Sequence, residues 1–187
     1  MKIFKWVILS IVLLPVSAFA FYKPARVIMP EVFGMDCYQN ICIDDSAKLS
    51  LAVSLVNGAQ RELHEKWGLR INDPKVIFCS TERCQRNFGH SKTAGYTFGA
   101  FGIVIQPRGW KEYYVAHELI HLWQADKFGS LVLIFGEPWV TEGMAYSFSS
   151  DPRAELDEPF ESYRKKFIEW YGNNESVPLE ISISKVL

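Results

Sequence analysis

The chain has 187 residues, of which 49% are hydrophobic and 22% are charged, and its formal net charge is −1. This length suits one globular domain and is too short for two of ordinary size, so we expect a single domain over residues 21–187. The charge shows no basic excess, which argues against a nucleic-acid-binding protein, so no nucleic-acid partner is predicted.

The first twenty residues have the three-part pattern of a secretory signal peptide. Residues 1–5 are positively charged, residues 6–14 are apolar, and residues 18–20 read Ala-Phe-Ala, a small-x-small cleavage pattern. The apolar run is too short for a comfortable membrane span, so we expect cleavage after Ala20 and no stable membrane anchor afterwards. Loss of the two lysines in this segment changes the net charge from −1 to −3. The mature protein is therefore predicted to be periplasmic or secreted.

The four cysteines form two Cys-x4-Cys pairs, Cys37 with Cys42 and Cys79 with Cys84. In an oxidising compartment an even set of this kind predicts two disulfides. Three connectivities are open, and we favour the two local ones because short loops already bring those sulfurs together. The alternative is a structural zinc site with four cysteine ligands, which export disfavours.

The first part of the mature chain predicts an extended segment and then a long helix. Residues 21–36 contain two prolines and little periodicity, so they are expected to be extended. Asp44-Asp45-Ser46 is an N-cap cluster, and the apolar residues after it recur at helical spacing. We therefore predict a core-facing helix over residues 46–67 that ends at Gly68.

A small sheet is predicted to follow this helix. Residues 76–78 are a short apolar run after a turn and are expected to form a strand. Residues 79–95 are polar and are expected to be a loop. Two more strands are predicted over residues 96–98 and 102–106, with Gly99-Ala100-Phe101 between or within them.

The most informative stretch is His117-Glu118-Leu119-Ile120-His121, which reads H-E-x-x-H. It lies in a helix predicted over about residues 110–127, where the two histidines fall one turn apart on one face. The helical wheel gathers the apolar side chains on one side and the polar ones on the other. The polar side holds Tyr114, His117, Glu118, His121 and Gln124.

Two more helices are predicted downstream. Residues 131–135 are apolar and indicate either a buried connector or a hydrophobic wall of a substrate cleft. Glu137-Pro138 begins a helix over about residues 138–149, with proline near its first position. Another helix is expected from Asp157 to about Tyr171, with aromatic side chains packed inward, and residues 173–187 carry no clear pattern.

The motif supplies the donors of a metal site. Two imidazoles four residues apart can reach one tetrahedral ion, usually zinc, and Glu142, with twenty residues between it and His121, is the candidate third ligand. This set leaves one position for a water, whose pKa the ion lowers toward ~7. Glu118 lies about 100° further round the helix, too far to be a ligand, and is predicted to take that water's proton as general base. The expected chemistry is peptide-bond hydrolysis with one Zn²⁺ per chain.

These segments resemble the zinc-binding helices of the gluzincin metallopeptidases. Trp139-Val140-Thr141-Glu142-Gly143-Met144-Ala145 is similar to the W-x-x-E-G-x-A signature of gluzincin aminopeptidases, and its distance from H-E-x-x-H also matches. The resemblance covers roughly residues 96–149. It implies the same zinc ligands, His117, His121 and Glu142, and the same general base. Thermolysin-like members carry an aspartate one turn after the ligand glutamate, where this chain has Tyr146.

The resemblance also implies a fold and a substrate position. The fold is α+β and zincin-like, with a small twisted sheet packed on the active-site helix, a backing helix and a glutamate helix. The strand before the motif helix is implied to be a sheet edge along which an extended peptide pairs. The substrate-binding residues implied there are Gly99, Ala100, Phe101, Gly102 and Ile103.

A donor for the oxyanion of the tetrahedral intermediate is still needed, and no motif identifies it. In order, the candidates for this catalytic role are Tyr163, Tyr146, His90 and Tyr114. Arg108 near the cleft could bind a carboxylate, but a solvated arginine is the simpler interpretation.

Two functions are left open by the sequence. The favoured one is an exported zinc metallopeptidase acting on peptides or cell-envelope proteins. The alternative is a catalytically inactive zincin-like module, in which the metal joins two helices and the protein serves in binding or envelope assembly. Glu118 favours the peptidase, because a structural site needs no carboxylate beside an open coordination position.

Overall fold

The computed structural model of the protein describes residues 22–90 and 92–187. The predicted signal peptide and its cleavage after Ala20 lie outside these residues and stay predictions. Within the described part of the chain, no helix is both long and apolar enough to cross a membrane.

The fold is built on a five-stranded mixed sheet in the order β1-β2-β3-β5-β4. The strands are β1 (Asp36–Tyr38), β2 (Ile41–Ile43), β3 (Val76–Phe78), β4 (Gly95–Thr97) and β5 (Ile103–Ile105). The inner strands β2, β3 and β5 run parallel, whereas the outer strands β1 and β4 pair antiparallel with their neighbours. Every residue of β3 and β5 is buried, as parallel strands covered on both faces require.

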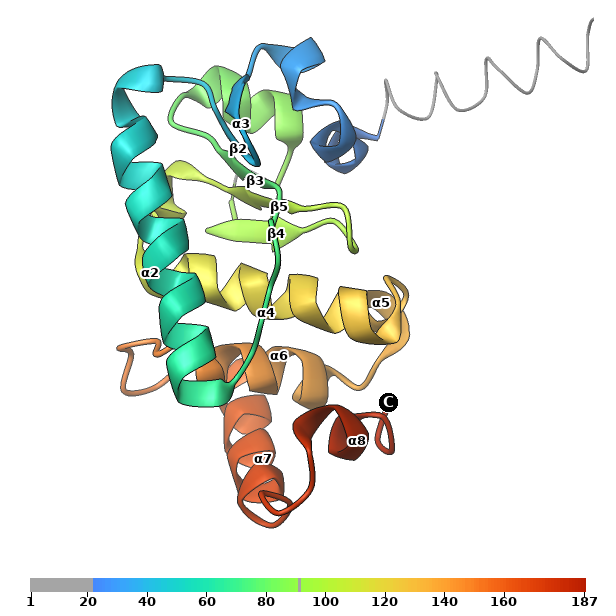
Figure 1. The fold of residues 1–187 in the computed structure, drawn as a ribbon. Helices are drawn as coiled ribbons and strands as arrows, with labels where there is room; N and C mark the ends of the chain where they lie inside the picture. Colours follow the sequence, from blue (N-terminus) through green and yellow to red (C-terminus); the bar gives the residue numbers. More distant parts are fainter. Residues whose placement is uncertain (1–21, 91) are drawn as a thin grey trace, which may run out of the picture.

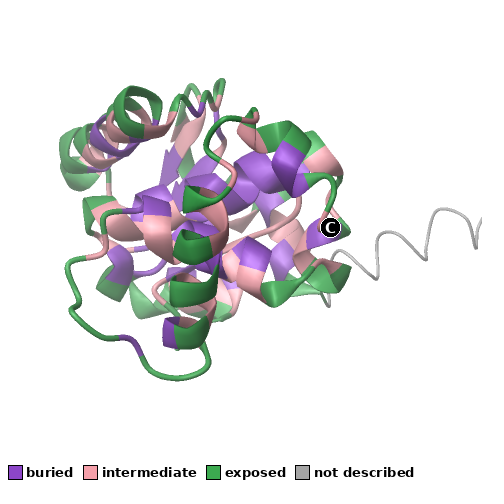
Figure 2. Ribbon diagram, turned by 90° about the horizontal axis from the view of Figure 1, so that it is seen from below, coloured by how far each residue is buried: buried purple, intermediate pink, exposed green. Residues whose placement is uncertain are grey.

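The sheet separates two hydrophobic cores, because successive side chains of a strand point to opposite faces. Val76 and Phe78 of β3 face the larger core, and Ile77 faces the smaller one. The larger core is closed by helices, which Figure 1 shows below and beside the sheet. They are α2 (Leu49–Trp67), α4 (Glu112–Phe128), α6 (Pro138–Phe148) and α7 (Phe160–Gly172). Figure 2 shows the buried residues gathered in the interior and the exposed ones on the outer faces of the peripheral helices.

Both disulfides lie at the smaller core and cross-link the elements around it. Cys37–Cys42 joins the antiparallel pair β1–β2, and Cys79–Cys84 joins the end of β3 to the helix α3 (Glu82–Phe88). The predicted local pairing is thus confirmed, and two disulfides are typical of proteins exported to an oxidising compartment.

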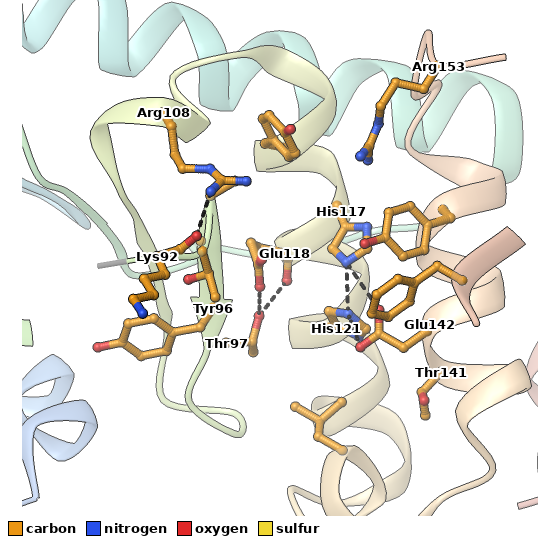
Figure 3. A pocket seen from close by; sticks show the side chains of 17 residues that line it. Lys92, Tyr96, Thr97, Arg108, His117, Glu118, His121, Thr141, Glu142 and Arg153 are labelled. Atoms are coloured by element: carbon orange, nitrogen blue, oxygen red, sulfur yellow. Dashed lines mark hydrogen bonds and ion pairs between the residues drawn. The ribbon is translucent and has the colours of Figure 1, made fainter. Parts of the chain in front are cut away.

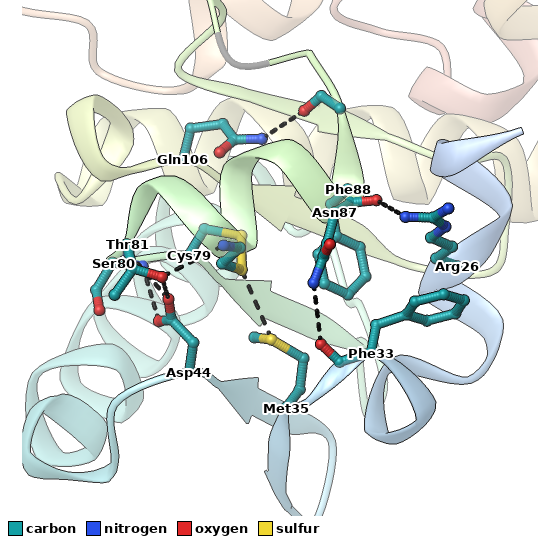
Figure 4. The surroundings of a disulfide bond; sticks show 12 residues. Arg26, Phe33, Met35, Asp44, Cys79, Ser80, Thr81, Asn87, Phe88 and Gln106 are labelled. Atoms are coloured by element: carbon teal, nitrogen blue, oxygen red, sulfur yellow. Dashed lines mark hydrogen bonds between the residues drawn. A yellow bond between two sulfur atoms is a disulfide. The ribbon is translucent and has the colours of Figure 1, made fainter. Parts of the chain in front are cut away.

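In Figure 4 the carboxylate of Asp44 accepts hydrogen bonds from the backbone N–H groups of Ser80 and Thr81 at 2.8 and 2.9 Å.

The predicted α+β class and the long helices are confirmed. α2 is preceded by the 3-10 turn η3 (Ser46–Lys48) and ends at Gly68, whose left-handed φ of +68° explains the stop. Asp45 caps the turn by accepting from the N–H of Ala47. The helices predicted over 110–127, 138–149 and 157–171 correspond to α4, α6 and α7 within a few residues.

Three segments differ from the prediction. The expected loop 79–95 contains α3, which Thr81 caps by accepting from the N–H of Cys84. The expected extended segment 21–36 forms two 3-10 helices, η1 (Lys23–Ile28) and η2 (Pro30–Phe33). The tail forms the short helix α8 (Leu179–Ile183). All of these elements are too short to display a clear helical period in the sequence. Only α3 among them has a side-chain cap, whereas η1, η2 and α8 each begin within one residue of a proline.

The predicted sheet edge is also corrected. β5 pairs with β3 on one side and with β4 on the other, so the strand near Gly99–Ile105 is interior. The edge strand on the side of α4 is β4, because the hairpin folds its first strand outward. Residues 99–102 form the hairpin connection, where the N–H of Ala100 donates to the Ser130 hydroxyl at 3.0 Å.

The apolar segment 131–135 is resolved as the short helix α5 (Val132–Phe135). It is not a buried connector, since Ile134 and Phe135 are 71% and 79% exposed. Leu133 turns the other way and lines the cleft described below, as a hydrophobic wall would.

Candidate metal and catalytic site

The polar side of α4 is enclosed, although the sequence left its environment open. α4 lies between the sheet edge β4 and the helix α6, and it contacts both. As a result Glu118 and His121 are each only 8% exposed, and Gln124 is 1% exposed. Polar groups buried to this extent need partners, and each of the three has them.

The three predicted metal ligands meet at one point. Nε2 of His117 and Nε2 of His121 each lie 3.5 Å from a carboxylate oxygen of Glu142, on α6. The donor atoms of the three residues all lie within 4.8 Å of one another, so the group could hold a metal ion. Figure 3 shows the three side chains converging from α4 and α6.

The spacing of the two imidazoles fits a tetrahedral ion. Their Nε2 atoms are 3.1 Å apart. Two nitrogens bound to one tetrahedral zinc at about 2.0–2.1 Å are about 3.3 Å from each other. Two imidazole nitrogens face each other at this distance only if a proton or a cation lies between them, so the donor set is compatible with zinc.

Gln124 fixes the tautomer of His121. Its amide nitrogen donates to the carbonyl of Thr141 at 3.1 Å, and a carbonyl can only accept. The amide oxygen must therefore face Nδ1 of His121, 2.9 Å away, and that nitrogen must donate. The lone pair of His121 is then on Nε2, directed toward Glu142 and His117. This is the orientation that a metal ligand needs, and it is supplied by Gln124 rather than by an aspartate at position 146.

Glu118 is held beside the three ligands by the edge strand. The hydroxyl of Thr97 donates to Oε2 of Glu118 at 2.9 Å and also to its backbone carbonyl at 3.0 Å. Gly95 makes room for the side chain, because a Cβ there would lie 2.9 Å from Cγ and 3.1 Å from Oε1 of Glu118. Burial raises the pKa of Glu118, against the opposing effect of the two histidines and Thr97.

The charges of the three candidate metal ligands interact strongly and shift the pKa values of His121 and Glu142. Burial alone would lower the pKa of His121, but Glu142, Glu118 and Gln124 together outweigh burial and raise it to about 9. Burial alone would raise the pKa of Glu142, but His121 and His117 outweigh burial and hold it well below its usual range. Without an ion, the site therefore keeps a proton between an imidazole and a carboxylate at neutral pH.

A cleft of about 460 Å³ opens over these residues (Figure 3). Its floor is formed by α4, one wall by β4 and the other by α6 and the loop after it. The lining residues are Lys92, Thr93, Ala94, Gly95, Tyr96, Thr97, Arg108, Tyr114, His117, Glu118, His121, Leu133, Thr141, Glu142, Tyr146, Arg153 and Phe160.

The candidate oxyanion donors separate into two groups. Tyr146 and Tyr114 line the cleft, and the Tyr146 ring lies 4.5 Å from the His117 ring. Burial raises the pKa of Tyr146 to about 12, so its hydroxyl keeps its proton at neutral pH. Tyr163 and His90 are not among the lining residues; they pack against Phe160 and Tyr96 respectively. The structure thus favours Tyr146 over Tyr163.

The implied substrate-binding residues Gly99, Ala100, Phe101, Gly102 and Ile103 do not line the cleft, whereas residues 94–97 do. The free edge of the sheet at β4 is the surface that an extended peptide could pair with.

Sequence reasoning also did not assign roles to Gly95, Thr97, Gln124 and Arg153. Of these, only Gln124 had a usable signal, its place on the polar side of the motif helix.

Comparisons with protein-family models, with curated proteins and with solved structures found no match for this chain. The residues themselves therefore carry the functional argument.

Proposed function

We propose that the protein is an exported, zinc-dependent metallopeptidase that hydrolyses peptide bonds. The observation that carries this proposal is Glu118, a buried carboxylate that lines the cleft beside three converging metal donors. A site that only joined two helices would not need it. The packing of α4 between a sheet edge and the glutamate-bearing α6 supports the zincin-like arrangement that we include in the proposal.

The chain's own residues supply the remaining steps. His117, His121 and Glu142 would hold the ion, which when bound supplies Lewis-acid polarisation of the substrate carbonyl and a more acidic water. Glu118 takes the proton of the attacking water, and its raised pKa makes it a better base than an exposed carboxylate. It then gives the proton to the departing amine. Thr97 keeps the carboxylate in place through both transfers.

The remaining groups bind the substrate and stabilise charge. An extended peptide would add to the sheet along β4, which places its backbone over Glu118. The hydroxyl of Tyr146, next to His117, is the best-placed donor for the developing oxyanion.

The direct test combines metal content with cleavage of a broad peptide library. We expect about one zinc per chain and cleavage that a chelator abolishes and added zinc restores. A protein that binds zinc but cleaves no library peptide would instead support the inactive zincin-like module.

Gln124→Leu is expected to weaken zinc binding by about 10- to 100-fold, the usual effect of losing a group that orients a ligand histidine. The substitution removes the acceptor for Nδ1 of His121 and frees the ring to change tautomer. Gln124→Glu keeps that acceptor and should retain more of the affinity. Chelator competition measures both variants. Equal affinity of Gln124→Leu and the wild type would show that His121 is oriented by something else.

Gly95→Ala is expected to lower kcat/KM by about 10- to 100-fold while leaving about one zinc per chain, since small displacements of a catalytic group have effects of this size. The added methyl group would lie within 3.1 Å of Oε1 of Glu118 and push the carboxylate aside. Gly172→Ala, where a Cβ meets nothing within 4 Å, is the matched control. Cleavage by Gly95→Ala at the wild-type rate would contradict the assigned position of the base.

Zinc affinity is expected to rise about tenfold per pH unit between pH 6.5 and 9, because the ion must displace the proton of His121, whose pKa is raised to about 9. The stability of the metal-free protein should change in the opposite sense. The contribution of His121 is complete below its unfolded pKa of 6.5 and is lost as the pH rises through 9. Zinc titrations and chemical unfolding across this window test both trends, and a flat affinity would rule out the coupling.

A further inference from the structure

The cleft carries more positive side chains than the proposed chemistry uses. Its two acidic lining residues, Glu118 and Glu142, are assigned to the base and to the metal. Its three cationic lining residues are Lys92, Arg108 and Arg153. Among residues 22–90 and 92–187, neither Lys92 nor Arg108 has a carboxylate partner; Arg108 donates to the backbone carbonyl of Lys92 instead. Such an excess attracts an anionic group of a ligand.

Arg153 is the cation that is held in place. Its backbone N–H and its Nε donate to Oδ1 of Asp151 at 3.0 and 2.9 Å, and its Nη2 pairs with the same carboxylate. The Asp151 side chain is only 2% exposed, whereas that of Arg153 is 40% exposed. A buried carboxylate therefore orients an accessible guanidinium. In the described part of the chain, Asp151 is the only carboxylate that pairs with Arg153, and the guanidinium stands beside the Tyr146 ring in the lining of the cleft, where a ligand can reach it.

The guanidinium lies close enough to the metal donors to contact a bound peptide. Its central carbon is 5.7 Å from the centre of the Tyr146 ring, which is itself 4.5 Å from the His117 ring, so it lies at most about 10 Å from His117. An extended peptide advances about 3.3–3.6 Å per residue, so this distance corresponds to two or three residues. Figure 3 shows Arg153 pointing toward His117, while Arg108 lies on the other side of the cleft, next to the sheet.

We propose that Arg153 determines substrate specificity by binding a carboxylate within two or three residues of the scissile bond. This inference rests on the proposed function. Arginine and carboxylate form directional, charge-assisted hydrogen bonds, and the guanidinium is already oriented for them by Asp151. The carboxylate can come from the C-terminus of the peptide or from an acidic side chain, and Arg108, on the other side of the cleft, adds attraction for either one.

The experiment compares kcat/KM for two matched peptide pairs. In one pair, the peptide ends two or three residues from the scissile bond in either a free C-terminus or a C-terminal amide. In the other pair, either glutamate or glutamine stands two or three residues from the scissile bond. We expect the wild type to prefer the carboxylate member of one pair by about 10- to 100-fold, and that pair identifies the source. Arg153→Met should bring the ratio close to one, and Arg153→Lys should retain part of it. Arg86→Met, a surface arginine on α3, should leave the ratio unchanged.

A binding measurement separates this inference from the proposed function. In the Glu118→Gln background, the carboxylate peptide should bind more tightly than its neutral partner, and adding Arg153→Met should remove the difference. Equal cleavage and equal binding of both members would overturn the inference while the peptidase assignment stands. If no peptide is cleaved, the peptidase assignment fails and the binding comparison alone decides the role of Arg153. If Arg153→Met lowers kcat for both members of a pair without changing the ratio of their kcat/KM values, the specificity role of Arg153 is also overturned.

Discussion

Glu118→Gln is expected to lower the hydrolysis rate by about 10²- to 10⁴-fold, the usual contribution of a general base, while keeping about one zinc per chain. Glutamine has nearly the same shape and can still accept the hydrogen bond from Thr97, so the ligand group should be undisturbed. What it lacks is a basic carboxylate at neutral pH. Single-turnover cleavage together with zinc analysis measures the two effects separately.

The stability of the Glu118→Gln variant tests separately whether Glu118 serves catalysis or holds the fold together. Burial disfavours the charged form of Glu118 and raises its pKa, so a neutral amide should make the metal-free protein at least as stable as the wild type. Asp126→Asn, an exposed change of the same kind on the same helix, serves as the control and should alter neither activity nor stability. A large loss of stability in Glu118→Gln would indicate that the carboxylate is mainly structural. Unchanged hydrolysis would eliminate it as the base.

The sequence predicted those parts of the site that depend on helical periodicity. His117, Glu118 and His121 belong to one continuous helix, so their relative positions follow from its geometry. Glu142 required only the additional assumption that a second helix packs against the first. The pairing of α4 with α6 confirms that assumption.

The parts that depend on tertiary contacts could not be predicted in the same way. Thr97 and Gly95 reach Glu118 because β4 lies outside β5, yet the chain order of two three-residue strands does not say which of them is at the edge. Gln124 stood on the polar side of the helix, but its role depends on the carbonyl of Thr141, which only the packing of α6 brings near. Arg153 lies in a loop without any period, and only its contact with Asp151 shows that it is fixed.

Glu142→Ala is expected to weaken zinc binding by more than about 100-fold, beyond the effect of losing an orienting group, because it removes one of three ligands. Hydrolysis should disappear with the metal, which distinguishes this variant from Glu118→Gln. Zinc titration measures the loss. The exposed Glu137, just before α6, offers the matched control Glu137→Ala, which should bind zinc as the wild type does.

The same substitution should weaken the pH dependence of the metal-free protein's stability. Burial lowers the pKa of His121, and Glu142, Glu118 and Gln124 together raise it to about 9; without the Glu142 carboxylate the pKa of the imidazole falls, because the largest of the raising partners is lost. The metal-free Glu142→Ala protein should then lose less stability than the wild type between pH 6.5 and 9. Unfolding curves at several pH values test this. Retention of both tight zinc binding and the wild-type pH profile would show that the two histidines use a different third partner.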